Sequence, residues 1–576
     1  MNVKKLMAGT ALAAAASALL VACGGGGSGS SPAPTPVALK LTGTVAKGAA
    51  IAGATVEAKC NGGTATAITG ADGTYTLNLT VGTLPCVLKV TSGSTTLYSV
   101  ATGTGTKATA NITPITEMIV ARFAGQDPAA YYSNFSTNNA AALTATAVAA
   151  AQAAVADVLK TNGIDVSAAG DALAGNLVAT SGSITGNALD QVLDQLNTKL
   201  AASGTTLTQL VTAVQQPVSS TPSATPSVAA ELLLQPGTAS CPAFRSGTYR
   251  LVVPTVGPTG SNGSASTETA SFNATTQVIT FSSDGSSGTL VAMAGSPCRF
   301  TATGGGGGTA DVVVSQAGVV AVKTTDGFFG VLFPEQKIPL SDLAGNWNWL
   351  GMDRQNLTDP LAPNAASFTL DSGGVLSNVL FCPDAKTCAA NSAGLTLTVN
   401  TAGGYDLNFA GSSDKSRAFA YRAGGGELMI VGVGQDGTWA FLTKKRTNTL
   451  PTAGTVSTGW NAGTLSTQVN GVWQQSAFDT SDYLNTIMSV DTGTNSVRRD
   501  NVLNFTSMLT RPETVILNTV GTTAREGFDY RKPETVLNSA GASSNVVEFI
   551  RLPFRGMGFN AIVTGTSQFS LSVAKP

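Results

Sequence analysis

Carboxylates in the C-terminal half are the candidate acid–base groups of this chain: Asp353, Asp359, Asp371, Glu427 and Asp436. Glycoside hydrolysis uses two such groups across a cleft, but their spacing singles out no pair, and Asp436 belongs to an Asp-Gly turn. Histidine is absent from all 576 residues. Imidazole is the base of Ser-His-Asp and Cys-His sites, so these mechanisms are excluded. We predict no catalytic residue and no cofactor.

Tryptophan is confined to the C-terminal region, where Trp347 and Trp349 share one face of a predicted strand. An exposed aromatic pair can stack on sugar rings or anchor a protein partner. A buried pair would instead fill the interior of a barrel, which is the commoner behaviour of aromatic side chains. Packing inside a barrel is therefore the favoured interpretation, and Trp347 and Trp349 are carried forward as candidate binding residues for a carbohydrate or protein ligand.

The N-terminus has the features of a signal peptide over residues 1–22. Lys4 and Lys5 precede an apolar stretch from Leu6 to Leu20, which is a charged region followed by a short hydrophobic one. A permanent transmembrane helix needs about 20 apolar residues, so this shorter stretch favours removal over retention in the membrane.

The apolar stretch ends in Leu20-Val21-Ala22-Cys23, which resembles the lipobox of bacterial lipoproteins. The resemblance implies cleavage before Cys23 and lipidation of that residue, with an ordinary secretory signal as the alternative. Several acyl chains on one residue form a durable membrane anchor. In known lipoproteins an Asp after the acylated cysteine retains the protein at the inner membrane. Gly24 stands there, so the resemblance favours the outer membrane of the cell envelope.

Composition favours exported β-structure. Only 11% of residues are charged and 43% are hydrophobic, with 65 glycines and 24 prolines. Lys plus Arg number 32 and Asp plus Glu 33, so no basic surface indicates a nucleic-acid partner. Residues 23–36 are rich in Gly, Ser and Pro, which predicts a flexible tether.

Six cysteines remain besides Cys23, an even number in an oxidising compartment, which favours disulfides. A zinc site is disfavoured because the chain has neither a CxxC pair nor a histidine. Six cysteines allow 15 pairings. Proximity in the sequence suggests these pairs: Cys60 with Cys86, Cys241 with Cys298, and Cys382 with Cys388.

Residues 37–114 alternate apolar and polar side chains in short runs at 39–45, 54–58 and 74–79, which predicts a β-sandwich. The order Gly-Thr-Val at 43–45, Gly-Ala-Thr-Val at 53–56 and Asp-Gly-Thr-Tyr at 72–75 resembles the carboxypeptidase regulatory-like domain, a transthyretin-like sandwich. The resemblance implies a scaffold or adhesion module and no peptidase activity.

An isopeptide bond is a second hypothesis for this segment, because Lys40, Asn111 and Glu57 have the required residue types. Lys40 alternates with two leucines, however, and so belongs to the solvent face of its strand. A solvated lysine is the better interpretation.

Residues 115–216 show helical periodicity. Asp127-Pro128 is typical of a helix start, and apolar stripes precede Gly163 and Gly204. A helical layer packed on the sandwich is favoured over a partner-binding or membrane-facing helix pair, because the polar faces lack basic residues. Residues 217–240, with several prolines, are a predicted linker.

Residues 241–576 are predicted to form repeated antiparallel β modules, either barrels or sandwiches. Three closing hairpins recur at 320–333, 429–442 and 559–571, each with two apolar strands around a Gly-containing turn. A Gly-x-aromatic opening recurs at 246–249, 344–347 and 470–473. The sequence thus predicts a mainly β envelope lipoprotein with a non-catalytic binding or structural role. A lipid-anchored carbohydrate-active hydrolase that uses Asp and Glu is the alternative.

Overall fold

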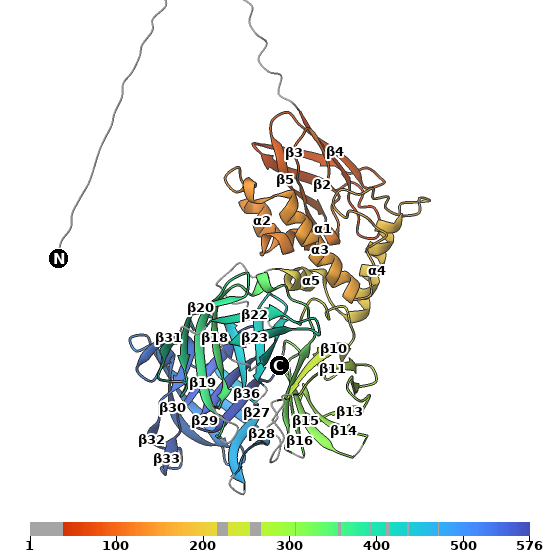
Figure 1. Ribbon diagram of the computed structural model, residues 1–576. Coiled ribbons are helices and arrows are strands. Elements are labelled where there is room, and N and C mark those ends of the chain that lie inside the picture. The colour runs from red at the N-terminus through yellow and green to blue at the C-terminus, as the bar shows by residue number, and fades with distance from the viewer. Residues whose placement is uncertain are drawn as a thin grey trace, which may run out of the picture. The chain divides into compact units, whose positions relative to one another are not determined.

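The computed structural model describes residues 38–215, 228–253, 266–305, 307–325, 327–354, 359–391, 394–409, 415–434, 437–469 and 472–576. The predicted signal peptide, the tether, Cys23 and Asp436 lie outside these residues. The described chain is mainly β, as predicted from the sequence (Figure 1).

Two sheets form the N-terminal β-sandwich. Strand β4 shows why, because alternate residues are buried along its whole length. Its apolar side chains join those of the other sheet in one core. The first sheet has the order β4 (Thr74–Leu79), β1 (Leu39–Thr44) and β7 (Lys107–Thr109). The second has the order β3 (Gly63–Ile68), β2 (Thr55–Asn61), β5 (Thr83–Ser92) and β6 (Thr95–Ala101).

The isopeptide hypothesis does not agree with this sandwich. Lys40 is exposed and pairs across the parallel β1–β7 ladder with Lys107. The Asn111 side chain is instead buried, where it accepts a hydrogen bond from the backbone N–H of Thr44 at 3.1 Å and donates one to the carbonyl of Gly175 at 2.8 Å. Asn111 therefore joins the sandwich to the segment between two helices.

Helices between Pro114 and Val214 pack on the sandwich, as the sequence analysis favoured. The Asp127 carboxylate caps α2, and Gly204 ends α4 at a positive φ of 63°. Val87 and Val100 of the sandwich share one core with the helices. No described helix has the length and apolar character to cross a membrane. The helices are α1 (Pro114–Ala124), α2 (Pro128–Asn134), α3 (Ala145–Thr161), α4 (Ala188–Ser203) and α5 (Leu207–Val214).

The described part of the predicted linker, residues 228–240, is not a loose connection. Val228–Leu234 is mostly buried. The Asn162 side chain donates a hydrogen bond to the carbonyl of Ala230 at 3.1 Å and accepts one from the N–H of Leu234 at 3.2 Å. The apolar residues of this segment were hidden from the sequence analysis by the prolines that precede them.

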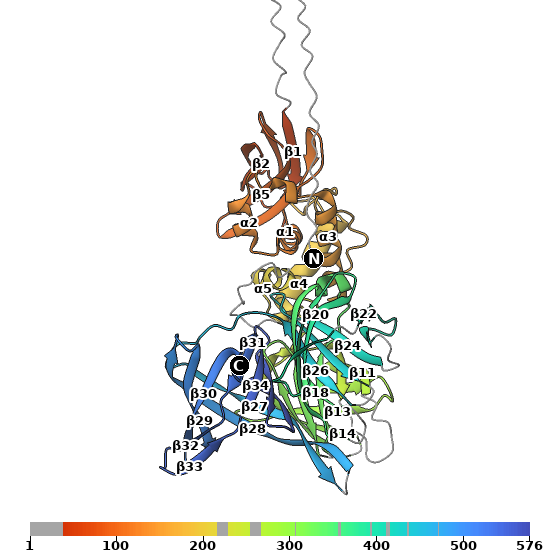
Figure 2. The ribbon, with the colours of Figure 1, turned by 60° about the vertical axis from the view of Figure 1, so that its left-hand side comes forward.

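The C-terminal region forms three consecutive eight-stranded antiparallel rings (Figure 1, Figure 2). The first barrel contains β10 (Gly247–Val253), β11 (Ser266–Asn273), β12 (Val278–Phe281), β13 (Ser287–Ala292), β14 (Arg299–Gly304), β15 (Thr309–Val314), β16 (Val320–Thr324) and β17 (Phe329–Pro334). It closes by pairing β10 with β17.

The second barrel is a nine-stranded sheet in which an additional β19–β20 pairing closes eight strands into a ring. These are β18 (Gly345–Asp353), β19 (Ala362–Leu370), β20 (Val375–Cys382), β22 (Leu395–Val399), β23 (Tyr405–Phe409), β24 (Lys415–Arg422), β25 (Leu428–Gly434) and β26 (Trp439–Lys444). The short strand β21 (Ala389–Asn391) pairs with β20.

The third barrel closes by pairing β27 with β36. It contains β27 (Val456–Val469), β28 (Val472–Asp491), β29 (Ser496–Asn504), β30 (Leu509–Val520), β31 (Thr523–Arg531), β34 (Phe549–Phe554), β35 (Phe559–Thr564) and β36 (Gln568–Ala574). A two-stranded ribbon, β32 (Glu534–Leu537) with β33 (Ser543–Val546), lies between β31 and β34 in the sequence.

The three predicted closing hairpins are the last two strands of the three barrels. The predicted openings are correct for two barrels. Gly247 and Gly345 adopt positive φ angles of 154° and 132°, which favour glycine. The following aromatics, Tyr249 and Trp347, are fully buried, and each donates a hydrogen bond at 2.8 Å to the carbonyl of the residue four positions earlier.

The predicted third opening at 470–473 is wrong, because the third barrel already begins with β27 at Val456. Its early aromatic is Trp460, which is fully buried outside the barrel. A three-residue motif was too short to predict where a barrel begins.

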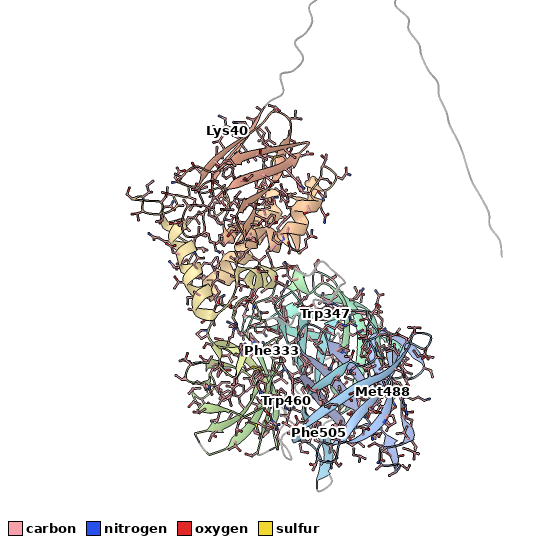
Figure 3. All side chains as sticks on the ribbon, turned by 180° about the vertical axis from the view of Figure 1, so that it is seen from behind. Lys40, Phe333, Trp347, Trp460, Met488 and Phe505 are labelled. Atoms are coloured by element: carbon pink, nitrogen blue, oxygen red, sulfur yellow. A yellow bond between two sulfur atoms is a disulfide. The ribbon has the colours of Figure 1, made fainter. Side chains whose placement is uncertain are left out.

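A shared core joins the outer faces of the three barrels. Trp439, on the outer face of the second barrel, is its centre. The Trp439 ring lies 5.6 Å from that of Phe329 in the first barrel and 4.3 Å from that of Phe569 in the third, measured between centroids. Phe333 and Trp460 belong to the same core (Figure 3). The outward positions of these strands are therefore apolar, although outward positions usually face water.

Replacement of Trp439 by Ala should lower the free energy of unfolding by about 3 to 5 kcal/mol, because it leaves a cavity where three barrels meet. Chemical denaturation followed by tryptophan fluorescence and circular dichroism would measure the change. Phe505→Ala is the matched control, because Phe505 is 44% exposed (Figure 3). Equal effects of the two substitutions would contradict a central role for Trp439.

Glu117, in the first turn of α1, supplies a pH-dependent contribution to stability. Burial, assisted by the negative charge of Asp127, raises the pKa of Glu117 to about 7 from an ordinary value of 4.5. The folded state therefore binds this proton more tightly than the unfolded state does. The contribution of Glu117 to the free energy of unfolding is fully present below its pKa in the unfolded state. It is lost as the pH rises through its pKa in the folded state.

Glu117→Gln should consequently raise the melting temperature at about pH 8 and change it little at about pH 5. Thermal unfolding of the wild type and the variant at both pH values would test this. A wild type and a variant with parallel pH profiles would show that Glu117 does not carry the effect.

Candidate functional site

Trp347 and Trp349 pack the interior of the second barrel. Trp347 is 0% exposed, and the ammonium group of Lys444 lies 4.4 Å from the centre of its ring. Trp349 is half-buried against the same core, and its indole N–H donates to the Asn364 side chain at 3.0 Å. The pair shares one strand face, as predicted, but it offers no exposed stacking platform. A binding role for an exposed aromatic pair is therefore corrected to a packing role.

Two of the candidate carboxylates, Asp353 and Asp371, lie far apart. The β18–β19 register places Asp353 opposite Ala362 and Gly345 opposite Leu370, the residue before Asp371. Asp353 and Asp371 thus lie at opposite ends of this strand pair, about 30 Å apart at 3.3 Å per residue. That separation exceeds the roughly 5 to 10 Å of glycosidase pairs.

Two further candidates, Glu427 and Asp359, lie elsewhere in the second barrel. The Glu427 carboxylate lies 3.7 Å from the Arg446 guanidinium group. Asp359 lies in the segment between β18 and β19. Within the described ranges, no group of three or more Cys, Asp or Glu side chains could hold a metal ion.

The cysteines form the three disulfides that sequence proximity suggests: Cys60–Cys86, Cys241–Cys298 and Cys382–Cys388. Cys60–Cys86 joins β2 to β5 within the sandwich, where the two residues are register partners. Cys241–Cys298 ties the short strand β9 (Cys241–Arg245) to the residue before β14. The Cys241–Cys298 disulfide therefore fixes β9 at one end of the first barrel.

The interior of the first barrel contains an apolar cavity of about 500 Å³. Its wall is formed by alternate residues of the strands, which the two-residue period directs inward. None of the described residues that line it is charged. The inward aliphatic and aromatic side chains include Leu251, Ile279, Phe281, Leu290, Val312, Val322 and Leu332. A cavity of this size suits one small apolar molecule.

One end of this cavity is closed by Phe244 on β9. Its ring stacks on that of Phe272 with 3.8 Å between centroids and meets the ring of Phe300 edge-on at 5.8 Å. The Cys241–Cys298 disulfide lies at the same end, because Cys298 immediately precedes β14. This end of the barrel is therefore closed by the Phe244 ring, and the disulfide at Cys241 fixes β9 three residues before it.

The other end of the cavity is lined by turns between strands. The β12–β13, β14–β15 and β16–β17 turns meet there, since alternate turns of an up-and-down barrel lie at one end. They contribute Ser286, Gly305, Thr325 and Phe328 to the cavity lining. The exposed ring of Phe328 is the large apolar side chain among them. Polar groups of this lining are thus hydroxyls and backbone atoms at this end.

Small inward residues keep the cavity open. Gly288, Ala302, Gly304, Ala310 and Gly330 occupy positions where large side chains would fill the centre. The second barrel has Trp347 and Phe368 in its interior core. Glycine and alanine at alternate, inward positions are the sequence signal for a cavity. That signal could not be read from the sequence, because these strands carry apolar residues on both faces and the inward positions could not be identified.

Comparisons with known proteins give little beyond this geometry. No protein-family model and no curated protein matches the sequence. Similar solved structures include a single and a double mutant of the vaccine antigen transferrin binding protein B from Haemophilus parasuis Hp5, with 10% and 11% sequence identity. Each alignment covers 57% of this chain and 75% of the other chain, with TM-scores of 0.19 and 0.18.

The intact protein Ap-TbpB, with N and C lobes, is similar at 11% identity over 57% of this chain and 76% of that chain, with a TM-score of 0.16. TM-scores this low carry no argument about the ligand or partner of this chain. The function proposed below therefore rests on the residues that line the barrels.

Proposed function

We propose that this chain is a lipid-anchored, non-catalytic binding protein of the cell envelope, and that its first barrel carries a small apolar molecule. The observation that carries the proposal is the apolar cavity of about 500 Å³ inside a closed barrel with one sealed end. Each 100 Å² of apolar ligand surface that enters it would contribute about 2.5 kcal/mol to binding. Such an interior suits a hydrocarbon or aromatic group without charge.

The cavity supports binding rather than catalysis. General acid–base chemistry needs a titratable group within hydrogen-bond reach of the substrate. The described wall residues supply alkyl groups, aromatic rings and the hydroxyls of Ser286, Ser287, Thr309, Thr324 and Thr325. These groups orient and enclose a ligand, and none has an ordinary pKa near neutrality.

Export and anchoring are supported by the sequence and the disulfides. Three disulfides fit an oxidising compartment. The lipobox-like motif at Cys23 supplies the anchor, and residues 23–36 the tether. The N-terminal sandwich would then serve as a carboxypeptidase regulatory-like scaffold between the outer membrane and the barrels. In this arrangement the membrane and a small apolar ligand are the partners of the chain.

Binding can be tested with N-phenyl-1-naphthylamine, an uncharged apolar dye that fluoresces when it leaves water. Ala302→Phe places an aromatic ring inside the cavity, and Thr301→Phe places the same ring on the exposed face of the same strand. We expect the wild type and Thr301→Phe to bind the dye alike, and Ala302→Phe to bind it about tenfold more weakly or worse.

Near-ultraviolet circular dichroism would establish that both variants are folded. Equal dye binding by a folded Ala302→Phe variant would contradict the site, as would failure of the wild type to bind.

Anchoring is tested separately in a bacterial host by Cys23→Ala. We expect the wild type to label with a radioactive fatty acid and to sediment with the outer membrane, because acyl chains hold it there. Cys23→Ala should be exported and recovered in soluble form without label. Membrane retention of Cys23→Ala would contradict the lipid anchor, and a matched Ser28→Ala variant in the tether should behave as the wild type.

A further inference from the structure

The third barrel has a second and chemically opposite interior. Alternate residues of its strands line a cavity of about 780 Å³. Apolar residues such as Ile487 and Phe549 gather in one part, while the remaining wall is rich in arginine, asparagine and serine. Trp460, the early aromatic of this barrel, faces outward into the shared core and so leaves the interior unfilled.

Arginine exceeds carboxylate around this cavity. The Glu513 side chain is 0% exposed and forms ion pairs with three guanidinium groups. These belong to Arg499, Arg511 and Arg531, at distances of 2.7 to 3.1 Å. Burial alone would raise the pKa of Glu513, but the positive charges of Arg499 and Arg531 hold it below its usual value. One carboxylate therefore stays ionised and balances one of three positive charges.

Two other arginines line this cavity together with Arg499 and Arg531. Arg551 donates two hydrogen bonds to one oxygen of Asp529, at 3.0 and 2.7 Å. Arg555 donates to the neutral side-chain oxygen of Asn448 at 3.2 Å. The wall therefore carries net positive charge in a partly enclosed space, where charges interact more strongly than in bulk water.

Two buried polar atoms on the cavity wall have no hydrogen-bond partner among the residues that the structure describes. They are the Nε–H of Arg499, a residue that is 9% exposed, and the side-chain oxygen of Asn485, which is 8% exposed. The β28–β29 register pairs Ile487 with Arg499 and Asn485 with Asn501, so Asn485 and Arg499 are diagonal neighbours on the inward face. The unpaired donor and the unpaired acceptor thus belong to diagonally neighbouring residues.

Neutral polar groups complete the wall. Asn461, Tyr483, Asn560, Ser570 and Ser572 all line the cavity. Amide and hydroxyl groups of this kind exchange hydrogen bonds with ligand hydroxyls, while guanidinium groups bind carboxylate or phosphate. A purely structural network would match its arginines with carboxylates.

We propose that the third barrel binds a small polyhydroxylated anion, either a sugar carboxylate or a sugar phosphate, with its charged group at Arg499 and a hydroxyl at Asn485. The site is independent of the apolar cavity of the first barrel. The shared chemistry is one anionic group next to several hydroxyls, and the two sources differ in the geometry and charge of the anion.

Isothermal titration calorimetry with the purified, folded wild-type protein would test the site. The probes are glucuronate and glucose 6-phosphate, with glucose as the neutral control. We expect at least one of the two anions to bind, more weakly as salt is added, and glucose to bind at least about tenfold more weakly than that anion. The preferred anion identifies the source.

Arg499→Gln should weaken binding of the preferred anion about tenfold or more, because a charged hydrogen bond is lost. Arg498→Gln is the matched control, since the neighbouring Arg498 faces the other side of β29 and pairs with Glu534 at 2.6 Å. Ser570→Phe, which fills the cavity without removing a charge, should abolish binding if the anion lies inside. Ala302→Phe in the first barrel should leave anion binding unchanged.

Failure of both anions to bind the wild type would overturn the proposal. So would equal affinity for glucose, equal effects of the Arg498 and Arg499 substitutions, or unchanged binding by a folded Ser570→Phe variant. Thermal unfolding of each variant distinguishes a lost site from a lost fold.

Discussion

Closure of the strand ladder is the constraint on which the C-terminal structure depends. Once the last strand of a barrel pairs with the first, no edge is left, and the two-residue period assigns each side chain to the inside or the outside. The β10–β17, β19–β20 and β27–β36 pairings therefore decide two things together. They create three enclosed interiors, and they direct a second set of apolar residues outward, where the shared core around Trp439 takes them up.

One architecture thus supports three different interiors. Trp347 and its neighbours pack the second barrel, small residues leave an apolar cavity in the first, and Arg499 with its neighbours makes the third polar. An eight-stranded barrel is near the size at which side chains either just fill the interior or leave room for one small ligand. A few substitutions at inward positions are consequently enough to change the chemistry of a barrel without changing its fold.

Local signals in the sequence predicted much of the fold. Turns, helix caps, the three closing hairpins and the cysteine pairs depend on residues close together in the chain, so the patterns at Asp127 and Gly204 were sufficient. Long-range packing was not accessible in this way. Strand β17 is buried at every position, so alternation cannot show that Leu332 points inward and Val331 outward. The same ambiguity concealed both cavities.

The shared core also limits how this protein can change over evolutionary time. Trp439 contacts Phe329 on one side and Phe569 on the other, so deletion of either outer barrel would expose a large apolar patch to water. Recombination at the barrel boundaries would thereby lower the solubility of the product. The three barrels are expected to be inherited as one block while their interiors diverge.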